Sequence, residues 1–143
     1  MKKALFILLS IFLLCGCSSK KETITLSHTV TLKFFYIETC SECKAFKTNV
    51  IPELEETFGD SIIIEQYDLD DKDTQEVYDE VIDSLLDFDE SYYGLGPAYA
   101  LEGYFFKLGY TSGDEDYLIE DIQKAVNDEE LSDELSGLRF TYQ

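Results

Sequence analysis

Two cysteines separated by two residues are the clearest candidates for chemistry in this chain. Cys40 and Cys43 enclose Ser41 and Glu42. The helix predicted to follow would place Cys40 at its start, where free N–H groups and the helix dipole stabilise a thiolate. Cys43 would lie one turn further in, on the same face and less exposed. The spacing favours thiol–disulfide exchange, with Cys40 as the attacking thiol and Cys43 as the resolving thiol.

Two other interpretations of the pair stay open. The pair could be a static disulfide in a non-enzymatic accessory or binding protein. It could also be part of a copper or zinc site, but zinc usually takes four ligands, and His28 is the only histidine in the chain. Carboxylates would have to complete such a site. We expect no resident metal and no other cofactor.

The start of the chain predicts export. A basic N-terminus precedes the apolar run Ala4–Leu14, which is shorter than the roughly 20 residues that a membrane-spanning helix needs. A basic start, a short apolar run and small residues after it are typical of a secretory signal, here residues 1–16. The sequence Leu14-Cys15-Gly16-Cys17 resembles a bacterial lipobox. That resemblance implies acyl chains on Cys17, an anchor in the cell membrane on its extracytoplasmic face, and a short tether over residues 17–22.

The charge of the chain excludes some classes of partner. Its formal net charge is −19, with 30 acidic and 11 basic residues. Nucleic acids and anionic membranes bind clusters of Lys and Arg, so we expect no nucleic-acid partner. Such a surface favours solubility and basic or unfolded partners. The acid-rich stretch 68–73 lacks the turn glycine of a calcium loop and is interpreted as a solvated loop. We expect a monomer.

Hydrophobic periodicity predicts one α/β domain over residues 23–130. Pro52 should kink or split the first helix. Gly103 should allow a tight hairpin, and Ser112 with Glu115 should form a capping box. The segment 131–143 is a C-terminal extension that could be a short helix, a strand or loose chain. Strands are predicted over residues 24–37 with a break near 27–28, and over 62–69, 98–101 and 104–108. Helices are predicted from about residue 40 to 58, and over residues 70–88 and 112–127.

The order of these elements resembles the thioredoxin-like superfamily. The shared landmarks are the Cys40–Cys43 motif between an apolar strand and a helix, Gly96-Pro97 before the hairpin, and Gly109 after it. The resemblance implies a compact α/β fold with a mixed central sheet of about four strands flanked by helices. It also implies a cis Gly96–Pro97 bond and a substrate-binding segment there. Four tyrosines could line the approach to this segment: Tyr36, which we rank first, and Tyr92, Tyr93 and Tyr99.

The function implied by the resemblance is that of a membrane-anchored thiol–disulfide oxidoreductase. It would act on thiols and disulfides of exported proteins through a cycle at Cys40 and Cys43, and an unidentified redox partner would recycle the pair. Glu38 and Glu42 place negative charge near the sulfurs and oppose the thiolate. We therefore expect a reductant or a mild isomerase rather than a strong oxidant.

Overall fold

The computed structural model describes residues 22–143. The predicted signal, the predicted lipidation site Cys17 and the tether up to residue 21 lie outside the described residues. Within residues 22–143, no helix is both long enough and apolar enough to cross a membrane.

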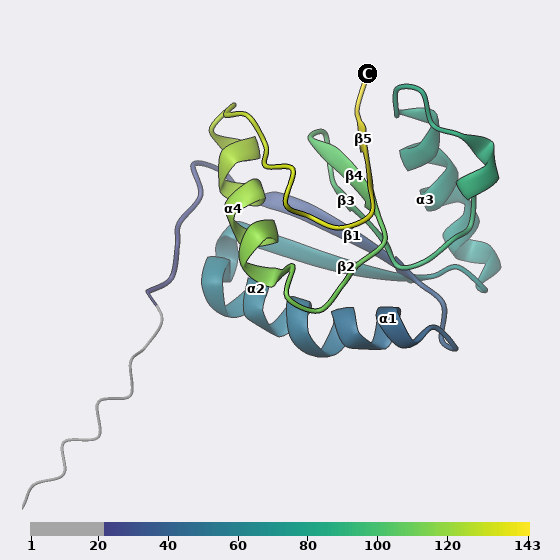
Figure 1. Cartoon of the computed structure of the whole chain (residues 1–143), viewed down its shortest axis with the longest axis horizontal. Helices are drawn as coiled ribbons and strands as arrows, with labels where there is room; N and C mark the ends of the chain where they lie inside the picture. Colours follow the sequence, from purple (N-terminus) through teal and green to yellow (C-terminus); the bar gives the residue numbers. More distant parts are fainter. Residues whose placement is uncertain (1–21) are drawn as a thin grey trace, which may run out of the picture.

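An open, mixed sheet of five strands, in the order β2-β1-β3-β4-β5, forms the centre of the described chain (Figure 1). β1 pairs in parallel with β2, and all other neighbours pair antiparallel. The α/β class is confirmed, but the sheet has five strands rather than about four. The strands are β1 (Val30–Tyr36), β2 (Ile62–Asp68), β3 (Ala98–Leu101), β4 (Phe105–Leu108) and β5 (Leu138–Thr141).

The extra strand comes from the segment whose structure the sequence left open. β5 pairs with β4, with Arg139 opposite Lys107 and Phe140 opposite Phe106. Leu138 and Thr141 are exposed while Arg139 and Phe140 are half-buried, so β5 lacks the alternation that marks a strand in the sequence. Residues 138–141 therefore belong to the sheet rather than to a loose extension.

One long helical rod follows the cysteine motif. It consists of α1 (Ser41–Ala45), a π-helical turn (Phe46–Val50) and α2 (Ile51–Phe58). Pro52 has no N–H, and its ring would clash with the carbonyl of the residue four positions earlier in a regular α-helix. The turn before it widens, and Ile51 N–H donates to the Phe46 carbonyl five residues back. The predicted distortion at Pro52 is therefore a π turn within a continuous rod.

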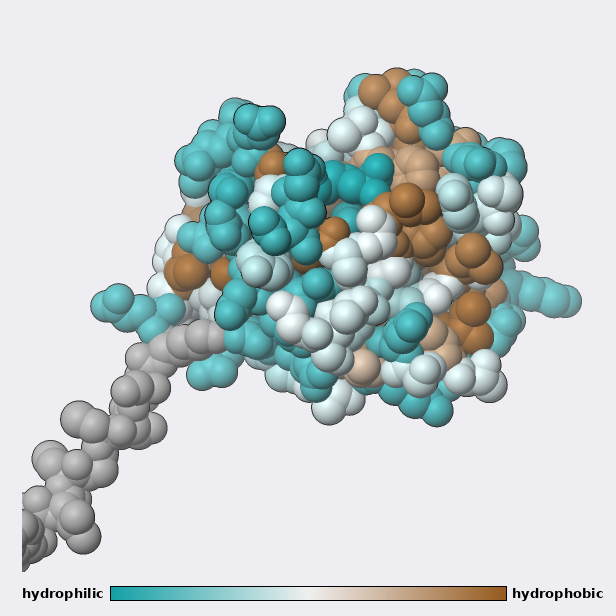
Figure 2. All heavy atoms as spheres, in the orientation of Figure 1, coloured by the Kyte–Doolittle hydropathy of each residue, from teal (hydrophilic) through white to brown (hydrophobic). Residues whose placement is uncertain are grey.

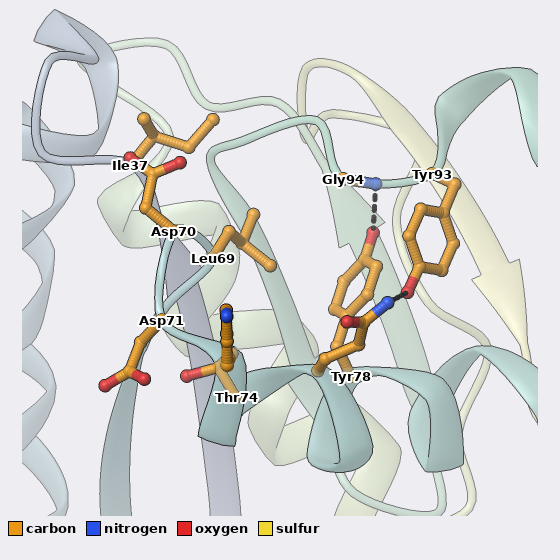
Figure 3. A pocket seen from close by; sticks show the side chains of 10 residues that line it. Ile37, Leu69, Asp70, Asp71, Thr74, Tyr78, Tyr93 and Gly94 are labelled. Atoms are coloured by element: carbon orange, nitrogen blue, oxygen red, sulfur yellow. Dashed lines mark hydrogen bonds between the residues drawn. The ribbon is translucent and has the colours of Figure 1, made fainter.

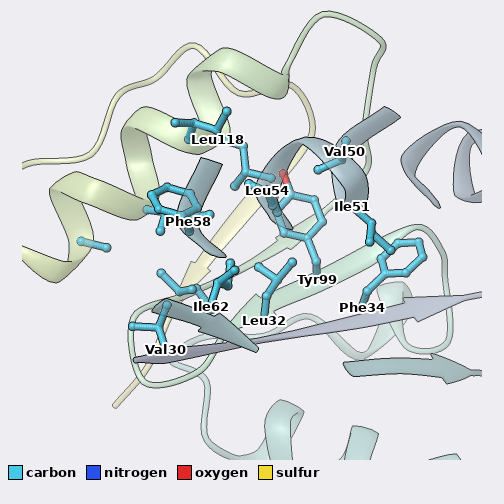
Figure 4. Close-up of a cluster of buried hydrophobic side chains, with 14 of the residues drawn as sticks. Val30, Leu32, Phe34, Val50, Ile51, Leu54, Phe58, Ile62, Tyr99 and Leu118 are labelled. Atoms are coloured by element: carbon cyan, nitrogen blue, oxygen red, sulfur yellow. The ribbon is translucent and has the colours of Figure 1, made fainter. Parts of the chain in front are cut away.

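Two further helices, α3 (Lys72–Asp83) and α4 (Glu115–Val126), complete the layers. The rod and α4 lie on one face of the sheet and α3 lies on the other (Figure 1). Each face has its own apolar core. The larger core packs the rod and α4 against β1, β2 and β3 (Figure 4). Residues 27–28 form a bend as predicted, but the strand predicted before the bend from residue 24 is wrong, because β1 begins only at Val30. The positive φ expected for Gly103 is found at 80°.

The predicted capping box at α4 is wrong. The residue at the N-cap is Asp114 rather than Ser112, and its carboxylate accepts from Thr111 N–H and from the hydroxyl of Ser136. The helix start is thus fastened to the C-terminal segment, a contact that a local motif cannot reveal. Tyr117, in the first turn of α4, is exposed.

Candidate functional site

The two sulfurs lie where the helix argument placed them. Cys40 and Cys43 form a disulfide with 5.2 Å between their Cα atoms. Cys40 is the N-cap of α1, and its Sγ accepts a hydrogen bond from Cys43 N–H at 3.1 Å. Cys40 is partly exposed, whereas Cys43 is only 1% exposed. A reagent from solution can therefore approach Cys40 but not Cys43.

The Gly96–Pro97 segment lies directly beside the disulfide. The Gly96 carbonyl oxygen is 3.9 Å from Cys40 Sγ, and the Gly96–Pro97 peptide bond is cis. The prediction of a cis bond next to the sulfurs is confirmed. A Cβ on Gly96 would lie 3.3 Å from Cys43 Sγ, so the absence of a side chain permits this close approach. Gly109, the third landmark of the sequence, donates its N–H to the Pro97 carbonyl at 2.8 Å.

Tyr36 reaches the surface near the sulfurs but is already covered by a cation. It ends β1 and is partly exposed, and Lys47 Nζ lies 3.0 Å from the centroid of its ring. The same ammonium is 3.4 Å from a carboxylate oxygen of Glu38. Lys47 thus offsets one of the two acids near the motif, while the Glu42 side chain stays exposed.

The other tyrosines divide between surface and core. Tyr99 is fully buried and packs on Phe46 with 4.9 Å between ring centroids, so it does not line the approach. Burial raises the pKa of the Tyr99 hydroxyl, to which the buried Asp114 carboxylate adds. Tyr92 is half-buried, whereas Tyr93 is exposed and its hydroxyl donates to Asp79. Of the four candidates, Tyr93 is therefore the most exposed, Tyr36 and Tyr92 are partly exposed, and Tyr99 is buried.

Apolar side chains are exposed on the connection between α3 and β3, which leads into Gly96-Pro97. Leu86, Tyr93 and Leu95 are the large hydrophobic residues exposed there. Figure 2 shows apolar surface around α3 and its connections on the right of the view, whereas the surface over α4 on the left is largely hydrophilic. Three other large hydrophobic residues are exposed elsewhere, namely Ile63 on β2, Tyr117 on α4 and Leu138 on β5.

A pocket of about 250 Å³ opens beside the site (Figure 3). It lies between the connection from β2 to α3 and the residues just before Gly96. The pocket was not predicted from the sequence, because the acid-rich stretch 68–73 was interpreted as a solvated loop. The signal that could have indicated it is Gly94, two residues before the Gly96-Pro97 landmark. The pocket is lined by Ile37, Leu69, Asp70, Asp71, Lys72, Thr74, Gln75, Tyr78, Tyr93 and Gly94.

A cluster of buried charges lies under α4. The Asp121 carboxylate is fully buried and pairs with Arg139 on β5 at 2.7 Å. Lys107 on β4 is 1% exposed and donates to the Leu135 carbonyl at 3.3 Å. Burial and, to a smaller extent, the nearby Arg139 cation lower the pKa of Lys107 to about 8, against the opposing effect of Asp114 and Asp121. The cluster joins the C-terminal segment to the sheet.

Metal ligands are not gathered around the disulfide in the described part of the chain. Within residues 22–143, no group of three or more His, Cys, Asp or Glu side chains is arranged to hold a metal ion. A metal at the two thiols would need its remaining ligands from a partner or from water.

Comparisons of the chain with protein-family models, with curated proteins and with solved structures find no match. The function is therefore inferred from the geometry of the cysteine pair and its surroundings.

Proposed function

We propose that this chain is a thiol–disulfide oxidoreductase of thioredoxin-like fold, anchored by lipid on Cys17 at the extracytoplasmic face of the cell membrane. The observation that carries the proposal is the asymmetry of the disulfide. Cys40 caps a helix and is partly exposed, whereas Cys43 is enclosed one turn further in. An attacking thiol needs access and a stabilised thiolate, and a resolving thiol needs only to reach the first sulfur.

The arrangement of elements supports the thioredoxin-like part of the proposal. The motif follows β1, which has a neighbouring strand on each side, and the segment with the cis proline lies against the sulfurs. Helices pack on both faces of the sheet, as the resemblance implies. The fifth strand, β5, extends this sheet at the edge next to β4.

The proposed cycle exchanges one disulfide for another. The Cys40 thiolate attacks one sulfur of a client disulfide, the client S–S bond breaks, and the leaving client thiolate takes up a proton. Cys43 then loses its proton and attacks Cys40, which releases the second client sulfur as a thiolate that is protonated in turn. The client gains two electrons and two protons, and the protein is left as the Cys40–Cys43 disulfide. A dithiol donor must return two electrons to complete the cycle.

Redox titration tests this function. We expect a reduction potential between about −120 and −270 mV, the range of thioredoxin-like enzymes. Replacing Glu42 by Gln should shift the potential by about 10 to 20 mV towards more oxidising values, because removal of an exposed negative charge favours the thiolate and hence the reduced form. An unchanged potential, or a shift in the opposite direction, would contradict the view that the Glu42 charge destabilises the Cys40 thiolate.

A structural disulfide in a binding lipoprotein is the second candidate. The near-complete burial of Cys43 favours it, since an enclosed sulfur resists reduction. The same titration separates the two candidates, because structural disulfides have potentials below about −300 mV. A value in that range would remove the oxidoreductase proposal. Copper or zinc handling would instead show as metal binding by the reduced protein that disappears in Cys40→Ala.

The anchor has its own test. Cys17→Ala should prevent lipid attachment, so the protein should appear in the medium or accumulate as an uncleaved precursor. Fractionation of cells that express each form, with detection of acyl chains by mass, gives the result. Cys15→Ala is the matched control and should leave lipidation intact. A mature Cys17→Ala protein that still fractionates with the membrane would contradict lipid anchoring.

A further inference from the structure

The pocket beside the cysteine site has two different walls. Figure 3 shows Ile37 and Asp70 on one side and the rings of Tyr78 and Tyr93 on the other, with Leu69 between them. The two rings meet edge to face with 5.1 Å between centroids. Gly94 N–H donates to the Tyr78 hydroxyl at 3.3 Å, which ties the aromatic wall to the segment before Gly96.

The pocket and the disulfide share structural elements. The Ile37 side chain lies 3.7 Å from where a Cβ of Gly96 would be, and its carbonyl accepts from Cys40 N–H at 3.0 Å. Gly94 lies two residues before Gly96, whose carbonyl oxygen is 3.9 Å from Cys40 Sγ. A polypeptide whose sulfur is at Cys40 could therefore place a side chain in the pocket from about two or three residues away.

The lining suits a long cationic side chain. Ile37 and Leu69 offer apolar contact to a methylene stem, and tyrosine rings attract a cation. The exposed Asp70 supplies a negative charge; among the described residues, only its backbone N–H, and not its carboxylate, is engaged in a hydrogen bond. Asp71 and Lys72 also line the pocket, so the formal charge of the lining is negative, although the Asp71 carboxylate already accepts from Asp73 N–H as the N-cap of α3.

The protein itself shows this mode of contact a few residues away. Lys47 Nζ lies over the ring of Tyr36 and next to the Glu38 carboxylate, which is the same combination of tyrosine and acid. In that case the chain provides its own cation. In the pocket, Lys72 is part of the lining, but among residues 22–143 it forms no ion pair with the Asp70 carboxylate and lies over neither tyrosine ring.

We propose that this pocket binds a lysine or arginine side chain of the client polypeptide, about two or three residues from the client cysteine that pairs with Cys40. The proposal rests on the proposed function and adds a substrate class to it, namely polypeptides with a basic residue near the reacting cysteine. The net charge of −19 is complementary to such clients and would draw them to the surface.

The experiment uses short peptides with one cysteine activated as a mixed disulfide with a chromogenic thiol. One peptide carries Arg two residues from the cysteine, a second carries the uncharged citrulline there, and a third carries Arg six residues away. The protein is the full chain with Cys15 and Cys17 replaced by Ser, reduced before mixing. Release of the chromophore gives the rate constant for each peptide.

We expect the near-Arg peptide to react at least threefold faster than the citrulline and far-Arg peptides. Asp70→Asn should bring the near-Arg to citrulline ratio close to one. Asp73→Asn removes the same charge from the exposed start of α3, outside the pocket lining, and should leave the ratio almost unchanged.

The outcomes separate the pocket from the chemistry. Equal rates for the near-Arg and citrulline peptides would overturn the pocket proposal while leaving exchange at Cys40 intact. An equal loss of preference in Asp70→Asn and Asp73→Asn would also overturn it, because the preference would then come from overall charge. If no peptide reacts, the proposed function fails and the pocket proposal fails with it.

Discussion

Cys43→Ala should accumulate a mixed disulfide with a client through Cys40, whereas Cys40→Ala should accumulate almost none. In Cys43→Ala the exposed thiol remains and the thiol that would release the client is absent. In Cys40→Ala the remaining thiol is 1% exposed and lies against Gly96, so a client disulfide cannot reach it. We expect at least a tenfold difference in the amount of trapped product.

The measurement is a non-reducing gel with mass spectrometry of the trapped species, on reduced full-length protein whose Cys15 and Cys17 are replaced by Ser. The double variant Cys40→Ala/Cys43→Ala sets the background. Equal trapping by the two single variants would show that Cys43 is as reachable as Cys40, and the division of roles would have to be given up.

Asp121→Asn should destabilise the domain by about 3 kcal/mol, the low end for a broken buried ion pair. The Asp121 carboxylate is fully buried and accepts both from Arg139 at 2.7 Å and from Ser132 N–H at 2.8 Å. Asn keeps the volume and one acceptor but leaves the mostly buried Arg139 cation unpaired, close to Lys107. The free energy of unfolding in urea gives the value.

The neighbouring residue provides the control. Glu120 forms an exposed ion pair with Lys124 one helical turn away, so Glu120→Gln removes the same charge and should change stability very little. Replacing Arg139 by Met in the Asp121→Asn background should recover part of the loss, because the unpaired charge is then gone. Similar losses in Asp121→Asn and Glu120→Gln would contradict the view that the buried pair holds β5.

Local signals were sufficient for much of the fold and for the cysteine site. Cys40 at a helix start follows from the apolar strand before it and the helical pattern after it. The hairpin at Gly103 depends on one residue whose backbone freedom is visible in the sequence. Pro52 predicts a distortion of the helix. Whether the helix breaks or widens into a π turn depends on how it packs against the sheet, which the sequence does not show.

Long-range contacts account for what the sequence did not reveal. β5 is held by Asp121, 18 residues before Arg139, and by pairing with β4. The Asp114 carboxylate accepts from Thr111 N–H and from the distant Ser136 hydroxyl rather than from an N–H group of its own helix. Tyr99 belongs to a strand buried on both faces, so its ring packs in the core. The pocket needs two loops that meet only in the folded chain.

The rate at which Lys107 is chemically modified can measure how often the C-terminal segment detaches from the sheet. At about pH 8 roughly half of its amine is unprotonated and therefore nucleophilic, yet the side chain is enclosed. An acylating reagent can modify it only when the segment around Leu135 and β5 detaches, whereas the exposed Lys44 reacts at once. The slowing of Lys107 modification relative to Lys44 thus reports the free energy of that local opening, separately from global unfolding.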